Sequence, residues 1–294
     1  MLLSFKLWWP QGRIFPLIPA FDFLPISFSG NLAYLPASLF ALLLLLGIFF
    51  SGNRVLLIAT LILATVLVLE DINRLQVWFY QLTSMLVLLF MAWRIEKEVI
   101  VSNLQMILIF IYFWSGFNKL SVYYMEDTFP WLMEVFPFLS KLGDNQLLAI
   151  GSALVEIVIA IGLLFTLTRK WAIGLAYLLH LFILMVLGPL GYDWNQVVWP
   201  WNICQMVFLY LLFHQSPQLD WINTVKKAPF TLGVIFLFGL MPALNLIHKW
   251  PDQLSFKMYS GTYSEGVIYA EAIDGICFLQ HQDMHQGRSP VGKP

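Results

Sequence analysis

The chain has 294 residues, of which 60% are hydrophobic and only 11% are charged, and its mean hydropathy is +0.76. A soluble domain carries about 25% charged residues, so this composition excludes an ordinary soluble protein and indicates an all-α membrane protein. The net charge of −1 gives no electrostatic basis for binding nucleic acid, and two cysteines are too few for a disulfide framework.

The N-terminal residues 1–32 are rich in aromatic residues and proline, which favours a segment that lies in the membrane interface. Residues 33–247 then contain apolar runs of about 17–22 residues, the length that crosses a bilayer as a helix. We therefore expect a polytopic transmembrane helix bundle with about eight spans, at 33–51, 54–70, 76–93, 100–118, 146–167, 171–188, 197–213 and 229–247.

Two segments outside these runs have a different composition. The long connection 119–145 is interrupted by proline and aromatic residues, which predicts an interfacial or re-entrant piece. Residues 248–294 predict a short extramembrane tail, with 255–259 and 267–269 as candidate strands. Cys277, His281 and His285 recur every four residues in this tail, but the polar context favours no metal site.

The loop charges predict the orientation of the chain, because Lys and Arg accumulate in cytoplasmic loops. The loops after the first, third, fifth and seventh runs hold seven such residues, namely Arg54, Arg94, Lys97, Arg169, Lys170, Lys226 and Lys227. The internal loops on the other side hold three, namely Arg74, Lys119 and Lys141. We expect the first set to face the cytoplasm, and both termini and the 119–145 connection to face outside.

Two ionisable residues interrupt apolar runs, where a charged group costs about 2.5–3.5 kcal/mol on insertion scales. Glu156 lies near the middle of 146–167, and it is either a proton-relay or substrate-binding carboxylate or a paired residue that ties helices together. His180 interrupts 171–188, and it is either a proton-transfer group near neutral pH or a hydrogen-bonded packing residue.

Polar residues on the expected outer side are further candidates for a binding site. Asp71 and Arg74 lie in the turn between the second and third runs, as a solvated ion pair or as one wall of a polar pocket. Trp199 and Asn202 lie at the start of the seventh run. The Trp199 ring fits an interface anchor as well as a pocket wall, whereas Asn202 lies on a helix face that can line a cavity.

Lys119 closes the fourth run, and helical spacing places Tyr112 and Ser115 on its face. Gly116 permits another helix to approach closely. Two interpretations of Lys119 stay open. Its amine either snorkels to the interface or lies beside an apolar cavity, where a lysine loses its charge readily and can act as a base.

The segment Gly116-Phe117-Asn118-Lys119-Leu120 resembles the vitamin K-dependent gamma-carboxylase family and, more broadly, is similar to the bacterial HTTM (horizontally transferred transmembrane) proteins. The resemblance covers roughly residues 33–247, and it includes a later helix with a histidine, which matches His180, and a polar turn, which matches Asp71 and Arg74. It implies that Lys119 is a base that acts on a reduced quinone. Asn118 replaces one of the family's two adjacent lysines, and the carboxylase's large lumenal region has no counterpart in this sequence.

The leading hypothesis is therefore a membrane enzyme that acts on a lipid-soluble substrate, with a reduced, vitamin K-like quinone as its cofactor. Lys119 and His180 are the candidate catalytic residues. The candidate substrate-binding residues are Tyr112, Asn118, Glu156, Asp71, Arg74, Trp199 and Asn202. The alternative is a non-enzymatic membrane transport or assembly protein, in which Glu156 and His180 form a proton path. The expected partner is the lipid bilayer, and the expected location is the inner membrane of a bacterium.

Overall fold

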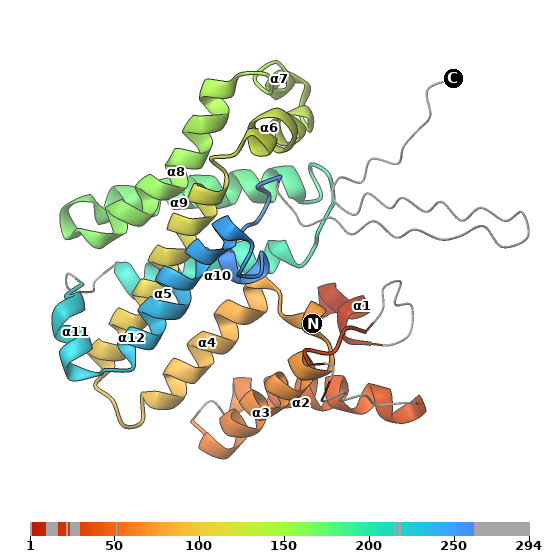
Figure 1. The fold of residues 1–294 in the computed structure, drawn as a ribbon, viewed down its shortest axis with the longest axis vertical. Helices are drawn as coiled ribbons and strands as arrows, with labels where there is room; N and C mark the ends of the chain where they lie inside the picture. The colour runs from red at the N-terminus through yellow and green to blue at the C-terminus, as the bar shows by residue number, and fades with distance from the viewer. Residues whose placement is uncertain are drawn as a thin grey trace, which may run out of the picture. The chain divides into compact units, whose positions relative to one another are not determined.

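The computed structural model describes residues 2–9, 17–21, 23, 30–50, 52–214, 216 and 219–261. All regular elements in these residues are helical, which confirms the all-α prediction (Figure 1). The main helices are α2 Leu35–Phe49, α3 Arg54–Glu70, α4 Val77–Met91, α5 Lys97–Asn118, α8 Gln146–Leu164, α9 Thr166–Leu187, α10 Val198–Phe213 and α12 Thr231–Val234, which continues through η5 Ile235–Leu240 and η6 Met241–Ile247.

Each of the eight expected ranges overlaps one of these helices, although α5 and α9 begin before their ranges, at Lys97 and Thr166. Four helical stretches are long and apolar enough to cross a membrane, namely Leu32–Phe49, Lys97–Asn118, Gln146–Leu164 and Thr166–Leu187. These four support an integral membrane protein. The helices α4, α10 and Thr231–Ile247 are apolar but shorter, so the count of eight spans stays a prediction.

Shorter helical elements connect the long ones. At the N-terminal end these are η1 Leu2–Ser4, α1 Phe5–Trp8, η2 Gly30–Tyr34 and η3 Ile72–Arg74. The 119–145 connection forms η4 Tyr124–Thr128, α6 Phe129–Glu134 and α7 Pro137–Ser140. The remaining ones are α11 Trp221–Lys227 and η7 Gln253–Ser255.

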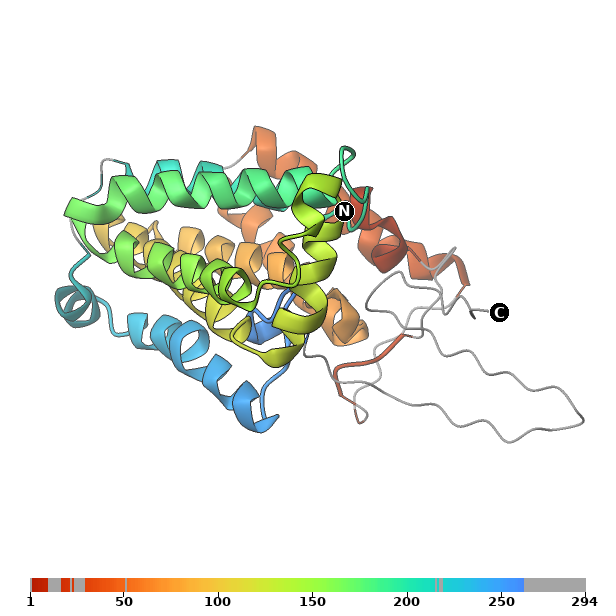
Figure 2. The ribbon, with the colours of Figure 1, turned by 90° about the horizontal axis from the view of Figure 1, so that it is seen from above.

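Helix α5 is the centre of the bundle. Apolar residues lie on all sides of this helix, as expected for a helix enclosed by other helices, and 78% of its apolar window is buried. The same share is only 17–33% in the other three long helices, whose outward side chains suit contact with lipid. Helices α4, α8, α10 and α12 contact α5, and Figures 1 and 2 show α9 lying against α8 and α10.

Contacts between loops support the predicted grouping of the loops by side. Arg54, which follows α2, lies over the ring of Trp93 after α4 at 4.9 Å. The Lys227 amine after α10 pairs with Glu96 before α5 at 2.5 Å, and the hydrogen bond to Glu96 raises the pKa of Lys227. The loops after α2, α4 and α10 therefore meet at one end of the bundle, although which end faces the cytoplasm stays a prediction.

The opposite end gathers the loops that were expected outside. The rings of Trp131 in α6 and Tyr192 after α9 stack with their centroids 4.8 Å apart. Ser121 after α5 donates a hydrogen bond to the carbonyl of Ser260 at 2.9 Å. The 119–145 connection, the α9–α10 loop and the segment after η6 thus share one end of the bundle.

One residue of the N-terminal segment packs into the bundle. Trp8 in α1 is fully buried, and its ring lies 5.8 Å from that of Phe40 in α2 and 5.4 Å from that of Phe79 in α4. Trp8 is therefore a core residue of the hydrophobic cluster formed by α2, α3 and α4. Of the other aromatic residues in this segment, Phe15 lies outside the described residues.

The segment after η6 is packed into the bundle as far as Gly261. Phe256 is fully buried, and its ring stacks on Tyr80 at 6.0 Å and on Phe238 at 5.8 Å. The strand expected at 255–259 is wrong, because η7 ends at Ser255 and Phe256 adopts the left-handed conformation with φ 57°. The expected strand 267–269 and the Cys277, His281 and His285 series lie outside the described residues.

Candidate functional site: a buried polar network

Lys119 and Glu156 form a buried ion pair between α5 and α8. The Lys119 amine lies 2.9 Å from Glu156 Oε1, and the two side chains are 9% and 7% exposed. The same amine donates to Ser115 Oγ at 2.8 Å and to the Ser115 carbonyl at 3.4 Å. Three acceptors thus match the three N–H bonds of an ammonium group. The amine is therefore fully hydrogen-bonded within the bundle.

Gly116 allows this pair to form. A Cβ atom at Gly116 would lie 2.7 Å from the Ala153 carbonyl oxygen and 2.9 Å from Glu156 Cβ, both on α8. Only glycine fits such an approach of two helices. The expectation that Gly116 permits close packing is confirmed, and the close approach brings Glu156 within reach of Lys119.

A second hydrogen-bonded group joins α5 to α9 and α10. The Tyr112 hydroxyl lies 2.5 Å from His180 Nε2, and His180 Nδ1 lies 2.6 Å from Asn202 Oδ1. Asn202 Nδ2 donates to the Val198 carbonyl at 2.8 Å, which only the amide nitrogen can do. The amide oxygen therefore faces His180 and accepts from Nδ1–H. In neutral His180, Nε2 is then the acceptor for the Tyr112 hydroxyl.

The two groups lie next to each other along α5. Tyr112 and Ser115 are three residues apart, so their side chains follow one another on one helix face. Asn202, His180, Tyr112 and Glu156 are all at most 6% exposed. Together these two hydrogen-bonded groups, which we call the network, connect α5 to α8, α9 and α10 in the bundle interior.

Tyr124 borders the network from the 119–145 connection. Its hydroxyl lies 2.8 Å from Ser152 Oγ, one helical turn before Glu156 on α8. Burial is the main cause that raises the pKa of Tyr124 above its usual 10.0, and Glu156 adds to it. The hydroxyl therefore stays protonated at physiological pH and can donate.

Two predicted substrate-binding residues hold backbone segments. Asn118 Nδ2 donates to the Ser255 carbonyl at 2.7 Å and so ties the end of α5 to η7. Trp199 Nε1 donates to the Leu187 carbonyl at 2.9 Å, at the C-terminal end of α9. Each side chain therefore bonds to a backbone carbonyl at the end of a helix.

Asp71 and Arg74 belong to a separate cluster in the α3–α4 turn. The carboxylate that pairs with Arg74 is that of Glu70, at 2.5 Å, and both side chains are 4% exposed. Arg74 also donates to the carbonyls of Leu67 and Leu7. Asp71 accepts hydrogen bonds from the N-terminal segment and from its own turn. This cluster therefore anchors the N-terminal segment, and its contacts lie apart from Lys119.

The sequence analysis did not identify Gln81, which belongs to a further polar group in the core. Gln81 on α4 and Gln205 on α10 exchange hydrogen bonds of 2.9 and 3.1 Å, and Trp201 Nε1 donates to Gln81 Oε1 at 2.8 Å. Gln81 is fully buried. The available signal was a lone glutamine inside the apolar stretch of α4, which is the same signal that identified Glu156.

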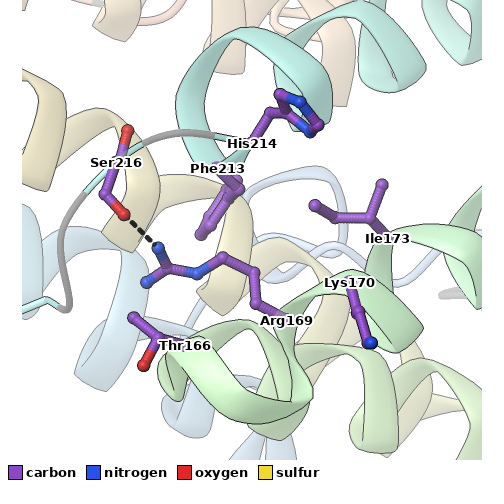
Figure 3. A pocket seen from close by; sticks show the side chains of 7 residues that line it. All are labelled: Thr166, Arg169, Lys170, Ile173, Phe213, His214 and Ser216. Carbon is purple, nitrogen blue, oxygen red and sulfur yellow. Dashed lines mark hydrogen bonds between the residues drawn. The ribbon is translucent and has the colours of Figure 1, made fainter.

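Two pockets in the described part of the chain stand out, and neither is lined by Lys119 or His180. One of about 410 Å³ lies where α9 begins and α10 ends (Figure 3). The other, of about 500 Å³, lies at the start of α8. The described residues also hold no group of three or more His, Cys, Asp or Glu placed to bind a metal ion.

Comparison with known proteins changes the family assignment. A family model described as "Methylamine utilisation protein MauE" matches residues 97–196, about a third of the chain. No curated protein and no solved structure matches the chain. The resemblance to the gamma-carboxylase and HTTM proteins is therefore wrong, because a five-residue motif after an aromatic helix is too short to identify a family. The matched region contains Lys119, Glu156 and His180, so this integral membrane protein is similar to MauE over the helices that carry most of the network.

Proposed function

We propose that this chain is a multi-pass membrane protein that moves protons through its buried network in support of membrane transport or of the assembly of another protein. The observation that carries the proposal is the Lys119–Glu156 ion pair in the interior of the bundle. The family description places the matched proteins in methylamine utilisation, and for this chain we propose a proton-linked step at the membrane.

The energetic cost of the pair supports a functional role. Removing two charges from water costs several kcal/mol per ion, and apolar residues of similar volume often replace a buried pair without loss of stability. Packing alone therefore gives no reason to place a Lys and a Glu between α5 and α8. Ionisable residues inside membrane bundles commonly serve proton relays or substrate paths.

The order of the hydrogen bonds supports proton transfer in particular. Tyr112 donates to His180 Nε2, and Nδ1–H donates to Asn202, so His180 has one defined site that accepts a proton. A histidine can take up and release that proton near neutral pH. The Lys119–Glu156 pair lies next to this group, because Ser115, which bonds to Lys119, follows Tyr112 by three residues on α5.

Proton flux into proteoliposomes tests this function. Purified protein is reconstituted in vesicles that contain a pH-sensitive dye, and a potassium diffusion potential drives protons inward. We expect faster acidification with the wild type than with protein-free vesicles, and slower acidification with Glu156→Gln. Tyr112→Phe is the second variant, because it breaks the link to His180 and keeps the ion pair.

The exposed Glu126→Gln in η4 is the matched control and should acidify at the wild-type rate. Equal rates for the wild type, Glu156→Gln and Tyr112→Phe contradict the proposal. A wild-type rate equal to that of empty vesicles contradicts it as well.

A further inference from the structure

The pocket at the junction of α9 and α10 has a strongly basic lining. Of the described residues that line it, three are basic, namely Arg169, Lys170 and His214, and none is Asp or Glu. The hydroxyls of Thr166 and Ser216 and the ring of Phe213 complete the wall, and Figure 3 shows the Arg169 side chain extending between the two helices. A pocket of about 410 Å³ with this charge is suited to an anion.

Arg169 is held in place before any ligand arrives. Its side chain is buried, Nε donates to the Leu163 carbonyl at 3.3 Å and NH1 to the Ser216 carbonyl at 2.7 Å. The guanidinium carbon lies 5.5 Å from the centre of the Phe213 ring. A planar guanidinium fixed in this way loses little conformational entropy when it binds an oxyanion.

The start of α9 adds a positive potential to the same place. Thr166 is the first residue of this 22-residue helix, and the preceding Phe165 provides no side-chain cap. By contrast, α8 begins with Asn145, whose side chain accepts from the amides of Leu147 and Leu148. The N-terminus of a long helix favours an anion, because its first amides point outward and the helix dipole is positive there.

The surroundings of the pocket indicate contact with lipid. Leu167 and Trp171, which flank the basic residues on α9, are 85% and 72% exposed. The Lys170 amine lies 5.1 Å from the Trp171 ring. Exposed leucine and tryptophan beside lysine are typical of the level at which a helix leaves the hydrocarbon for the head groups. The loop charges place this end of the bundle on the expected cytoplasmic side.

We propose that this pocket binds a phosphate group, and that its source is the head group of an anionic phospholipid. Arg169 and Lys170 contact the phosphate oxygens, His214 closes the pocket from α10, and the acyl chains lie along the exposed residues of α9. The bound lipid then joins the start of α9 to the end of α10. The site is distinct from the Lys119 network and does not depend on its function.

Thermal unfolding in nanodiscs tests the proposal without an activity assay. The full chain is placed in phosphatidylcholine discs with or without phosphatidylglycerol, and in phosphatidylcholine discs with added inorganic phosphate. The variant is Lys170→Gln with His214→Gln, which lowers the positive charge and leaves the buried Arg169 in place. The control is Lys141→Gln in the second pocket, which also lies at a helix start but contains Asp144.

Phosphatidylglycerol should raise the Tm of the wild type and of Lys141→Gln, and this rise should be lost in the double variant. Native mass spectrometry should show phosphatidylglycerol bound to the wild type about tenfold more tightly than to the double variant, as expected for the loss of a charge-assisted contact. Stabilisation by inorganic phosphate as well would support the phosphate site and identify a soluble source. An equal rise of Tm in the wild type and the double variant, or no rise in either, overturns the proposal.

Discussion

Tyr112 determines how His180 can exchange a proton. The Asn202 amide is oriented by its bond to the Val198 carbonyl, so the histidine proton sits on Nδ1 and Nε2 faces the tyrosine hydroxyl. The hydroxyl is the donor to a nitrogen that is buried away from water. Removing it leaves that nitrogen without a hydrogen bond.

We therefore expect Tyr112→Phe to lower the free energy of unfolding by about 1–3 kcal/mol, the cost of a buried acceptor that has lost its donor. Unfolding in mixed micelles, followed by circular dichroism, measures the change. Tyr123→Phe is the control, because Tyr123 is 59% exposed and should tolerate the loss of its hydroxyl. A Tyr112→Phe protein as stable as the wild type would show that the hydroxyl does not bond to His180.

Individual polar residues were visible in the sequence, but their partners were not. Glu156 and His180 each interrupt an apolar run, so composition alone identified them as unusual. The partner of Lys119 depends on how α5 packs against α8, which periodicity does not reveal. The sequence analysis left Lys119 either as an interface anchor or as a base beside a cavity, and neither interpretation included its ion pair with Glu156.

At the scale of elements, the contact of α5 with α8 positions the network. Gly116 faces a stripe of small residues on α8, in which Ala149, Ala153 and Ala160 are at most 1% exposed. Small residues on both helices bring the backbones close. Without this approach, the Lys119 and Glu156 side chains would be separated.

Gly116→Ala tests this approach. The added Cβ would lie 2.7 Å from the Ala153 carbonyl oxygen, so the helices must separate. We expect a loss of about 1–3 kcal/mol in the free energy of unfolding, typical of overpacking. Gly151→Ala on α8 has no atom within 4 Å of the new Cβ and is the matched control. Equal stability of the two variants would contradict the close contact.

The elements themselves were well predicted, because apolar length is a direct signal of a membrane helix. All eight expected ranges contain helices, whose ends differ from prediction by a few residues. The packing of residues 248–261 into the bundle could not be predicted from their polarity. Phe256 lies in a mixed polar and aromatic stretch, and its burial against Tyr80 and Phe238 depends on tertiary contacts.

At the scale of the whole molecule, the loops fall into two groups at opposite ends of the bundle. Arg54, Glu96 and Lys227 meet at one end, and the 119–145 connection meets the segment before Gly261 at the other. The excess of Lys and Arg in the first group predicts that this end faces the cytoplasm.

Cysteine labelling tests this orientation. Lys226→Cys and Asp144→Cys are made one at a time in a protein whose Cys204 and Cys277 are replaced by serine, and both positions are exposed. In intact cells, a membrane-impermeant maleimide should label position 144 and not position 226. The reverse pattern would invert the topology, and labelling of both positions would contradict a fixed orientation.

The central claim is that Lys119 and Glu156 act as one ionised pair inside the bundle, and a double-mutant cycle tests it most directly. Lys119→Met and Glu156→Met are made singly and together, and the free energy of unfolding is measured in mixed micelles. Each single variant leaves one buried charge and should lose about 3–5 kcal/mol, whereas the double variant should lose far less than the sum. If the two losses add to within about 0.5 kcal/mol, the residues do not interact, and the network has no ion pair at its centre.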